Sequence, residues 1–191
     1  FTETVPSVNV VPVAQSIPNN ATISPGLETE ILGTDISKYA IKNAAKKYIN
    51  NFYFVSSVYN LPIAKASTDL ILSVFSPIMV EEFKRILSKQ GYVVIVSPAS
   101  DHLREIAELI YDVFRPHTTN IVEKMTSFFE HDSTKRTTFK IDIKSAKDLL
   151  FLLKMTPYYW STGLGRLENI TNKNELSVTC DFNIDIFKPI D

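Results

Sequence analysis

The chain has almost no cysteine and no long apolar run. Its single cysteine, Cys180, excludes an intrachain disulfide and any zinc site built from several cysteines, and we expect no metal site. No apolar stretch approaches the roughly 18 residues that a membrane span requires. We therefore expect no membrane partner and a soluble, cytoplasmic protein.

An excess of charge of one sign is also missing. Lysine and arginine number 20 against 21 aspartates and glutamates, which gives a formal net charge of −1. The chain as a whole therefore has no field to hold a polyanion, and contact with nucleic acid would need a local basic patch. With 45% hydrophobic and 21% charged residues the composition is globular, and 191 residues fit one domain.

Glycine is scarce at the N-terminus, where proline is frequent. Residues 10–20 contain no glycine, and residues 1–27 contain four prolines. Proline removes backbone donors, so we expect only a short strand near Val8–Val11 within an otherwise irregular segment.

From residue 28 onward, apolar strands alternate with helices. The pattern predicts strands over 28–34, 52–57, 69–76 and 92–97, and helices over 37–47, 79–89 and 101–114. Gln90-Gly91 is expected to end the second helix, and Arg115-Pro116 the third. Continuous apolar strands separated by helices indicate a parallel sheet covered on both faces.

The last third has a different pattern. Residues 137–144 and 176–187 alternate polar and apolar side chains, and an apolar helix over 145–155 lies between them with Ser145 as N-cap. This arrangement predicts an antiparallel edge added to the parallel sheet.

Asp35 stands where the first of these strands ends and a helix begins. Ser37 is a suitable N-cap for that helix, whose inner side would carry four residues: Ile41, Ala44, Ala45 and Tyr48. In open α/β sheets, an acidic residue near this edge binds the ribose hydroxyls of a nucleotide-like cofactor. The alternative is a carboxylate that only favours the positive N-terminus of the helix.

Several passages resemble class I S-adenosylmethionine-dependent methyltransferases. "GTDISKYAIKNAAKKY" resembles their second motif, "FVSSVYNLPIAKASTDLILSVFSP" the third and fourth, and "FKRILSKQGYVVIVSP" the passage that follows. "SPASDHLREI", "LLKMTPYYW" and "DFNIDIF" are similar to the bacterial 23S rRNA methyltransferases that modify ring nitrogen 1 of guanine. The resemblance implies a Rossmann-like α/β fold, mostly parallel with an antiparallel C-terminal edge. It also implies methyl transfer from S-adenosylmethionine to guanine in large-subunit ribosomal RNA.

Two features of that family are missing. With one cysteine the chain has no four-cysteine zinc module, and "VVPVAQSIPNN" stands where a glycine-rich first motif should precede Asp35. Residues 1–27 are therefore expected to be an irregular remnant of the first-strand region, and 28–191 the methyltransferase-like domain. The alternative function is a catalytically inactive module of the same fold that binds RNA or a protein partner.

The resemblance also implies a set of cofactor-binding residues, while no catalytic residue is singled out. Asp35 and Ile36 would bind the ribose, and Ser57 and Val58, which follow the next strand, would contact the adenine. Ser76 of the fourth motif and His102 would complete the site. The alternative for His102 is a partly exposed histidine at the start of a helix, and the alternative for the other residues is ordinary packing. The set is Asp35, Ile36, Ser57, Val58, Ser76 and His102. The other two histidines, His117 and His131, are expected at the surface.

Two groups of basic residues could contact ribosomal RNA. Lysines 38, 42 and 46 form a stripe on one helix, for which a solvated face is the favoured interpretation over phosphate contact. A looser cluster comprises Lys135, Arg136, Lys140, Lys144 and Lys147. The nearby aromatic run 158–160 would stack on a flipped base, or would pack in the core.

Overall fold

The computed structural model describes residues 30–161, 170, 173 and 175–190. The chain divides into two compact units. The described part of unit 1 comprises 98–119, 136–161, 170, 173 and 175–183, and that of unit 2 comprises 30–97, 120–135 and 184–190. The segment 1–27, with the strand predicted near Val8–Val11, lies outside the described residues.

Unit 2 begins with a short parallel strand pair. β1 (Leu32–Asp35) pairs with β2 (Phe52–Val55), and α1 (Lys38–Lys47) connects them. Ser37 is the N-cap of α1, as predicted, because its hydroxyl accepts a hydrogen bond from the backbone N–H of Ala40 at 3.3 Å.

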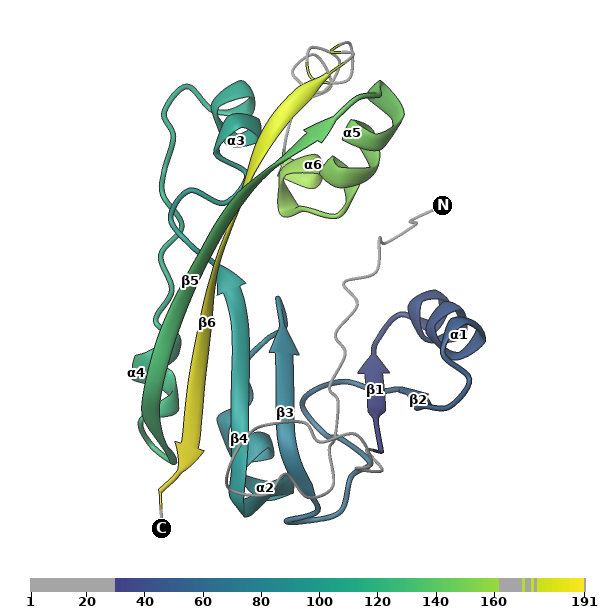
Figure 1. The fold of residues 1–191 in the computed structure, drawn as a ribbon, viewed down its shortest axis with the longest axis vertical. Helices are drawn as coiled ribbons and strands as arrows, with labels where there is room; N and C mark the ends of the chain where they lie inside the picture. The colour runs from purple at the N-terminus through teal and green to yellow at the C-terminus, as the bar shows by residue number, and fades with distance from the viewer. Residues whose placement is uncertain (1–29, 162–169, 171–172, 174, 191) are drawn as a thin grey trace. The chain divides into compact units, whose positions relative to one another are not determined.

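A four-stranded sheet of order β3-β4-β6-β5 follows. β3 (Thr68–Val74) and β4 (Leu87–Pro98) are parallel and are joined through α2 (Val80–Ile86). β5 (Phe129–Ile143) and β6 (Leu176–Pro189) contribute residues to both units. Figure 1 shows β6 running opposite to its neighbours β4 and β5. The predicted parallel strands with an antiparallel C-terminal edge are therefore confirmed.

The core of unit 2 lies between its helices and its strands. Buried side chains come from α2, β3, β4 and a further helix, α4 (Ile121–Met125), and Leu32 of β1 and Phe54 of β2 pack against them. Phe83 and Ile86 of α2 are at most 1% exposed. Burying an aliphatic or aromatic side chain of this size contributes about 1.5–3 kcal/mol, so α2 is firmly anchored.

Unit 1 has its own apolar core. α3 (Arg104–Ile110) and α5 (Ala146–Lys154) bury Ile106, Ile110, Leu149 and Leu153 against the ends of β5 and β6. Ser145 caps α5, as predicted, because its hydroxyl accepts from the Asp148 N–H at 3.1 Å. A short helix, α6 (Pro157–Ser161), follows α5.

Two predicted helices are shorter than expected. α2 ends at Ile86 and β4 starts at the next residue, so Gln90-Gly91 lies within the strand instead of ending the helix. An added Cβ at Gly91 would lie 2.9 Å from the Asp69 carbonyl oxygen, so glycine serves the close approach of β3 here. α3 ends at Ile110, because the later apolar residue Val113 finds no core and is 70% exposed.

The inner face of α1 also differs from the prediction. Ala40 is buried and Ile41 and Ala44 are half-buried, whereas Ala45 and Tyr48 are exposed. The lysine stripe at 38, 42 and 46 is exposed, as a solvated helix face requires. Within the described ranges, no helix is both long and apolar enough to cross a bilayer.

Candidate functional site

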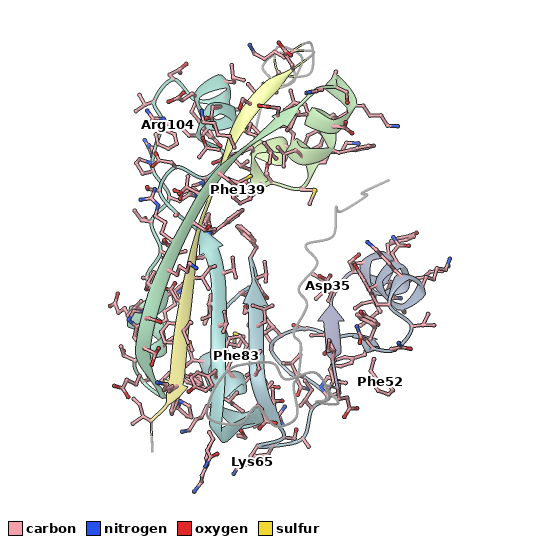
Figure 2. The ribbon with its side chains drawn as sticks, viewed as in Figure 1. Asp35, Phe52, Lys65, Phe83, Arg104 and Phe139 are labelled. Atoms are coloured by element: carbon pink, nitrogen blue, oxygen red, sulfur yellow. The ribbon has the colours of Figure 1, made fainter. Side chains whose placement is uncertain are left out.

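A cavity of about 280 Å³ lies at the carboxyl ends of β1, β2 and β3 in unit 2. In open α/β sheets this is the edge at which ligands bind. Figure 2 shows Asp35 at the end of β1 and Phe83 on α2, and both line the cavity. The lining residues are Thr34, Asp35, Ile36, Ser56, Ser57, Val58, Tyr59, Ser73, Ser76, Pro77 and Phe83.

Asp35 is held in a defined orientation. The residue is 3% exposed, and its Oδ1 accepts a hydrogen bond from the backbone N–H of Ser37 at 2.7 Å. That bond ties the carboxylate to the first turn of α1, whose N-terminus favours negative charge. An ionised carboxylate is an acceptor for the hydroxyl groups of a ligand, and this one lies in the wall of the cavity.

Two buried hydroxyl groups in the same wall have no hydrogen-bond partner among the described residues. Thr34 is 5% exposed and Ser73 is 2% exposed, and both Thr34 Oγ1 and Ser73 Oγ are unsatisfied. Leaving a buried polar group unpaired costs about 1–3 kcal/mol. Because both residues line the cavity, a polar ligand there would supply the missing partners.

The segment after β2 forms the exposed side of the cavity. Ser56 Oγ donates to the Asn60 carbonyl at 3.1 Å, and the Tyr59 N–H donates to Ser57 Oγ at 3.3 Å, which fixes this turn. Ile36 and Tyr59 expose 72% and 65% of their surface here. Apolar and aromatic side chains in this position suit a flat heterocyclic ring.

An ion pair on α2 holds the loop that continues from this turn. Glu82 accepts from the Leu61 N–H at 2.6 Å, while Arg85 donates to the Leu61 and Ile63 carbonyls at 2.9 and 2.7 Å. Arg85 also donates to both oxygens of Glu82, at 2.7 and 2.8 Å, and these bonds lower the pKa of Glu82. These bonds from α2 to Leu61 and Ile63 join residues more than 20 positions apart, so local sequence patterns do not predict them.

The backbone is strained where β3 reaches the cavity. Phe75, directly before Ser76, has a φ of 52°, which is unusual for a bulky residue. Such conformations cost about 1–3 kcal/mol and are concentrated at binding and active sites.

Comparisons with known proteins agree with this geometry. Residues 19–95 match a family described as a methyltransferase domain. A solved S-adenosylmethionine-dependent methyltransferase from Methanosarcina mazei superposes with a TM-score of 0.52 at 14% identity, covering 85% of this chain and 83% of that one. A protein from Deinococcus radiodurans gives a TM-score of 0.54 at 10% identity, covering 84% and 70%. The chain therefore has the fold of the class I methyltransferases, and residues 19–95 are similar in sequence to a methyltransferase domain.

Curated relatives of this methyltransferase-fold chain have names that refer to ribosomal RNA. It is 30% identical over 155 residues to YxjB of Bacillus subtilis, a candidate 23S rRNA (guanine-N1)-methyltransferase. It is also 30% identical over 120 residues to the 23S rRNA (guanine(748)-N(1))-methyltransferase of Streptomyces fradiae. These alignments cover 80% and 60% of this chain but 55% and 43% of the relatives, so the chain spans about half of their length.

Five of the six predicted site residues of the methyltransferase fold meet at one cavity. They are Asp35, Ile36, Ser57, Val58 and Ser76. The prediction missed Thr34 and Ser73, and the available signal was a hydroxyl side chain next to the last residue of each strand. Their burial without a partner depends on the tertiary structure.

His102 belongs to unit 1 and is not among the described residues lining this cavity. Its Nδ1 accepts from the Asp181 N–H at 3.3 Å, and its ring lies 4.9 Å from that of Phe182. Burial, assisted by the nearby His117 and opposed by Asp181, lowers the pKa of His102 to about 4. The histidine is therefore neutral near pH 7, and its contact with a cofactor stays a prediction.

Two of the five residues in the basic cluster predicted for RNA, Arg136 and Lys140, form ion pairs. Arg136 donates two bonds to the fully buried carboxylate of Asp181, at 2.6 and 2.8 Å, and lowers its pKa strongly. Lys140 lies 3.5 Å from Glu105. The two histidines expected at the surface are half-buried instead: His117 bonds to Tyr158, and His131 bonds to a threonine on its own strand.

Proposed function

We propose that the chain binds S-adenosylmethionine at the cavity beside Asp35 and methylates nitrogen 1 of guanine in 23S ribosomal RNA, in the cytoplasm. The observation that carries the proposal is one buried, oriented carboxylate with two unpaired buried hydroxyl groups at the carboxyl ends of parallel strands. The names of the relatives from Bacillus subtilis and Streptomyces fradiae support the choice of guanine and of 23S RNA.

The residues present suit this cofactor. Asp35 would accept hydrogen bonds from the ribose hydroxyls, and the apolar side chains of Ile36 and Val58 would contact the adenine ring. Thr34 and Ser73 would pair their hydroxyl groups with polar atoms of the cofactor. At about 280 Å³ the cavity is slightly smaller than typical small-molecule sites, which run from roughly 300 to 1,000 Å³.

S-adenosylmethionine supplies a methyl group already activated on a sulfonium. The chain's own contribution is therefore mainly to position and to exclude water, since neither a covalent nucleophile nor a metal is required. Asp35 stays oriented by the Ser37 N–H, and the Glu82–Arg85 pair holds Leu61, two residues after Tyr59 of the cavity wall. Guanine nitrogen 1 carries a proton at neutral pH, so a proton acceptor is needed near the RNA.

Methyl transfer is tested directly with tritiated S-adenosylmethionine and transcripts of 23S ribosomal RNA. Methylation at nitrogen 1 blocks base pairing, so reverse transcription should stop at the modified guanine. Asp35→Asn should lower incorporation at least tenfold, whereas Tyr39→Leu on the exposed face of α1 should leave it unchanged. Cofactor binding without any incorporation would instead support an inactive module that binds RNA or a protein partner.

A further inference from the structure

A second cavity, of about 650 Å³, lies within unit 1. Its walls come from the C-terminal part of α3, the segment that follows α3, and α6. The side chains that matter here are Tyr111, Asp112, Arg115, His117 and Tyr158. The proposed methyl transfer uses none of them, and nothing in the comparisons assigns them a role.

Two tyrosine rings and a histidine ring are part of the lining of this cavity. The rings of Tyr111 and Tyr158 meet edge to face with centroids 5.9 Å apart, and His117 lies 6.4 Å from Tyr158. Tyr158 Oη and His117 Nε2 share a hydrogen bond of 3.1 Å, which fixes both rings. Tyr111 nevertheless leaves 40% of its surface exposed, so part of its ring is available to a ligand.

Charged groups flank the rings. Arg115 and Asp112 are both exposed and both contribute to the walls. An arginine can contact a phosphate or stack on a ring, and a carboxylate accepts from the amino groups on base edges. Flat rings with one cation and one acceptor at their border match an unstacked nucleobase in a single strand better than an aliphatic ligand.

We propose that this cavity of unit 1 holds one unpaired base of the RNA substrate. The inference rests on the proposed function for the presence of RNA, and it adds a second contact besides the guanine to be methylated. The rings of Tyr111 and Tyr158 supply the stacking surface, and Arg115 pairs with the adjoining phosphate. A stacked base contributes roughly 1–3 kcal/mol, which corresponds to about 5- to 150-fold in affinity.

The test uses a fluorescein-labelled single-stranded RNA with the 23S sequence around the guanine located by the reverse-transcription stop, titrated with the protein and followed by fluorescence anisotropy. Tyr111→Ala should weaken binding about tenfold or more, and Arg115→Ala should weaken it and reduce the salt dependence by about one unit of slope. Tyr158→Phe keeps the ring and should change the affinity less than threefold. The matched control is Tyr39→Ala, because Tyr39 is 80% exposed on α1 and lines neither cavity.

A second readout does not depend on the stability of the variants. The same RNA with 4-thiouridine beside the target guanine should photo-crosslink the wild-type protein within residues 111–117. Crosslinks confined to other segments, or full affinity of both Tyr111→Ala and Arg115→Ala, would overturn the proposal. Cofactor binding measured on the same variants separates the two ideas: it should stay at the wild-type level if only the base contact is lost. If the wild type binds no cofactor while Tyr111→Ala still weakens RNA binding, the proposed function fails and the base site stands.

Discussion

The Glu82–Arg85 ion pair on α2 should stabilise both the folded chain and the loop beside the cavity at Asp35, and a single substitution tests this. Replacing Arg85 by methionine keeps the aliphatic stem and removes four hydrogen bonds, two to Glu82 and one each to the carbonyls of Leu61 and Ile63. Among the described residues, Glu82 would then keep one donor, the Leu61 N–H. The loop beside the cavity would lose its fastening to the helix.

The size of the effect follows from the burial of the carboxylate. Removing one partner of a buried ion pair costs about 3–5 kcal/mol. The side chain of Glu82 is 11% exposed but that of Arg85 is 36% exposed, so water can partly replace the guanidinium. We therefore expect Arg85→Met to lower the free energy of unfolding by about 3 kcal/mol, at the lower end of that range. The double variant Glu82→Gln with Arg85→Met should recover about 1–2 kcal/mol, because no charge stays buried.

Urea unfolding followed by circular dichroism gives the free energies, and hydrogen exchange of a peptide covering residues 57–67 reports on the loop itself. Lys84→Met is the matched control, because Lys84 lies beside Arg85 and makes an exposed bond to the Ile190 carbonyl. It should change stability by less than about 0.5 kcal/mol. The reasoning is refuted if Arg85→Met matches that control and the Leu61 amide exchanges at its wild-type rate.

Three further changes have definite expected outcomes. Between pH 6.5 and pH 4 the unfolded chain binds a proton at His102 that the folded chain does not, because the folded-state pKa is about 4. The wild type should therefore lose stability as the pH falls through this range. His102→Gln should abolish this part of the pH dependence in denaturation curves. Gly91→Ala should lower the free energy of unfolding in urea by about 1–3 kcal/mol, because its Cβ would lie too close to the Asp69 carbonyl. An unchanged free energy would show that β3 can move to accept the methyl group. Arg136→Ala should cost about 3 kcal/mol by leaving the carboxylate of Asp181 buried with fewer donors, so a melting temperature equal to wild type would contradict the pairing.

Local patterns in the sequence were sufficient to predict one side of the site. The apolar run, Asp35 and the N-cap Ser37 follow each other within a few residues, so strand end, carboxylate and helix start could be placed together. The parallel strands were predicted from continuous apolar runs, and the antiparallel edge from alternating polar and apolar residues, whereas the strand order was not predicted. These features depend on neighbours along the chain.

The remaining features depend on residues that are distant in the sequence. Arg136 and Asp181 are 45 positions apart, and a surface cluster was the natural interpretation of lysines and arginines near one another. Gly91 resembles a helix breaker until the carbonyl of Asp69 on β3 is seen next to it. The low pKa of His102 likewise arises from burial that only the packed unit provides.

Isothermal titration of the protein with S-adenosylmethionine tests the central claim most directly. The wild type should bind with micromolar or tighter affinity, and Asp35→Asn should bind at least tenfold more weakly. The double variant Thr34→Val with Ser73→Ala should also lose affinity, because the two buried hydroxyl groups would no longer pair with the cofactor. Absence of heat and of any thermal shift with the wild type at millimolar cofactor would contradict a cofactor site at this cavity.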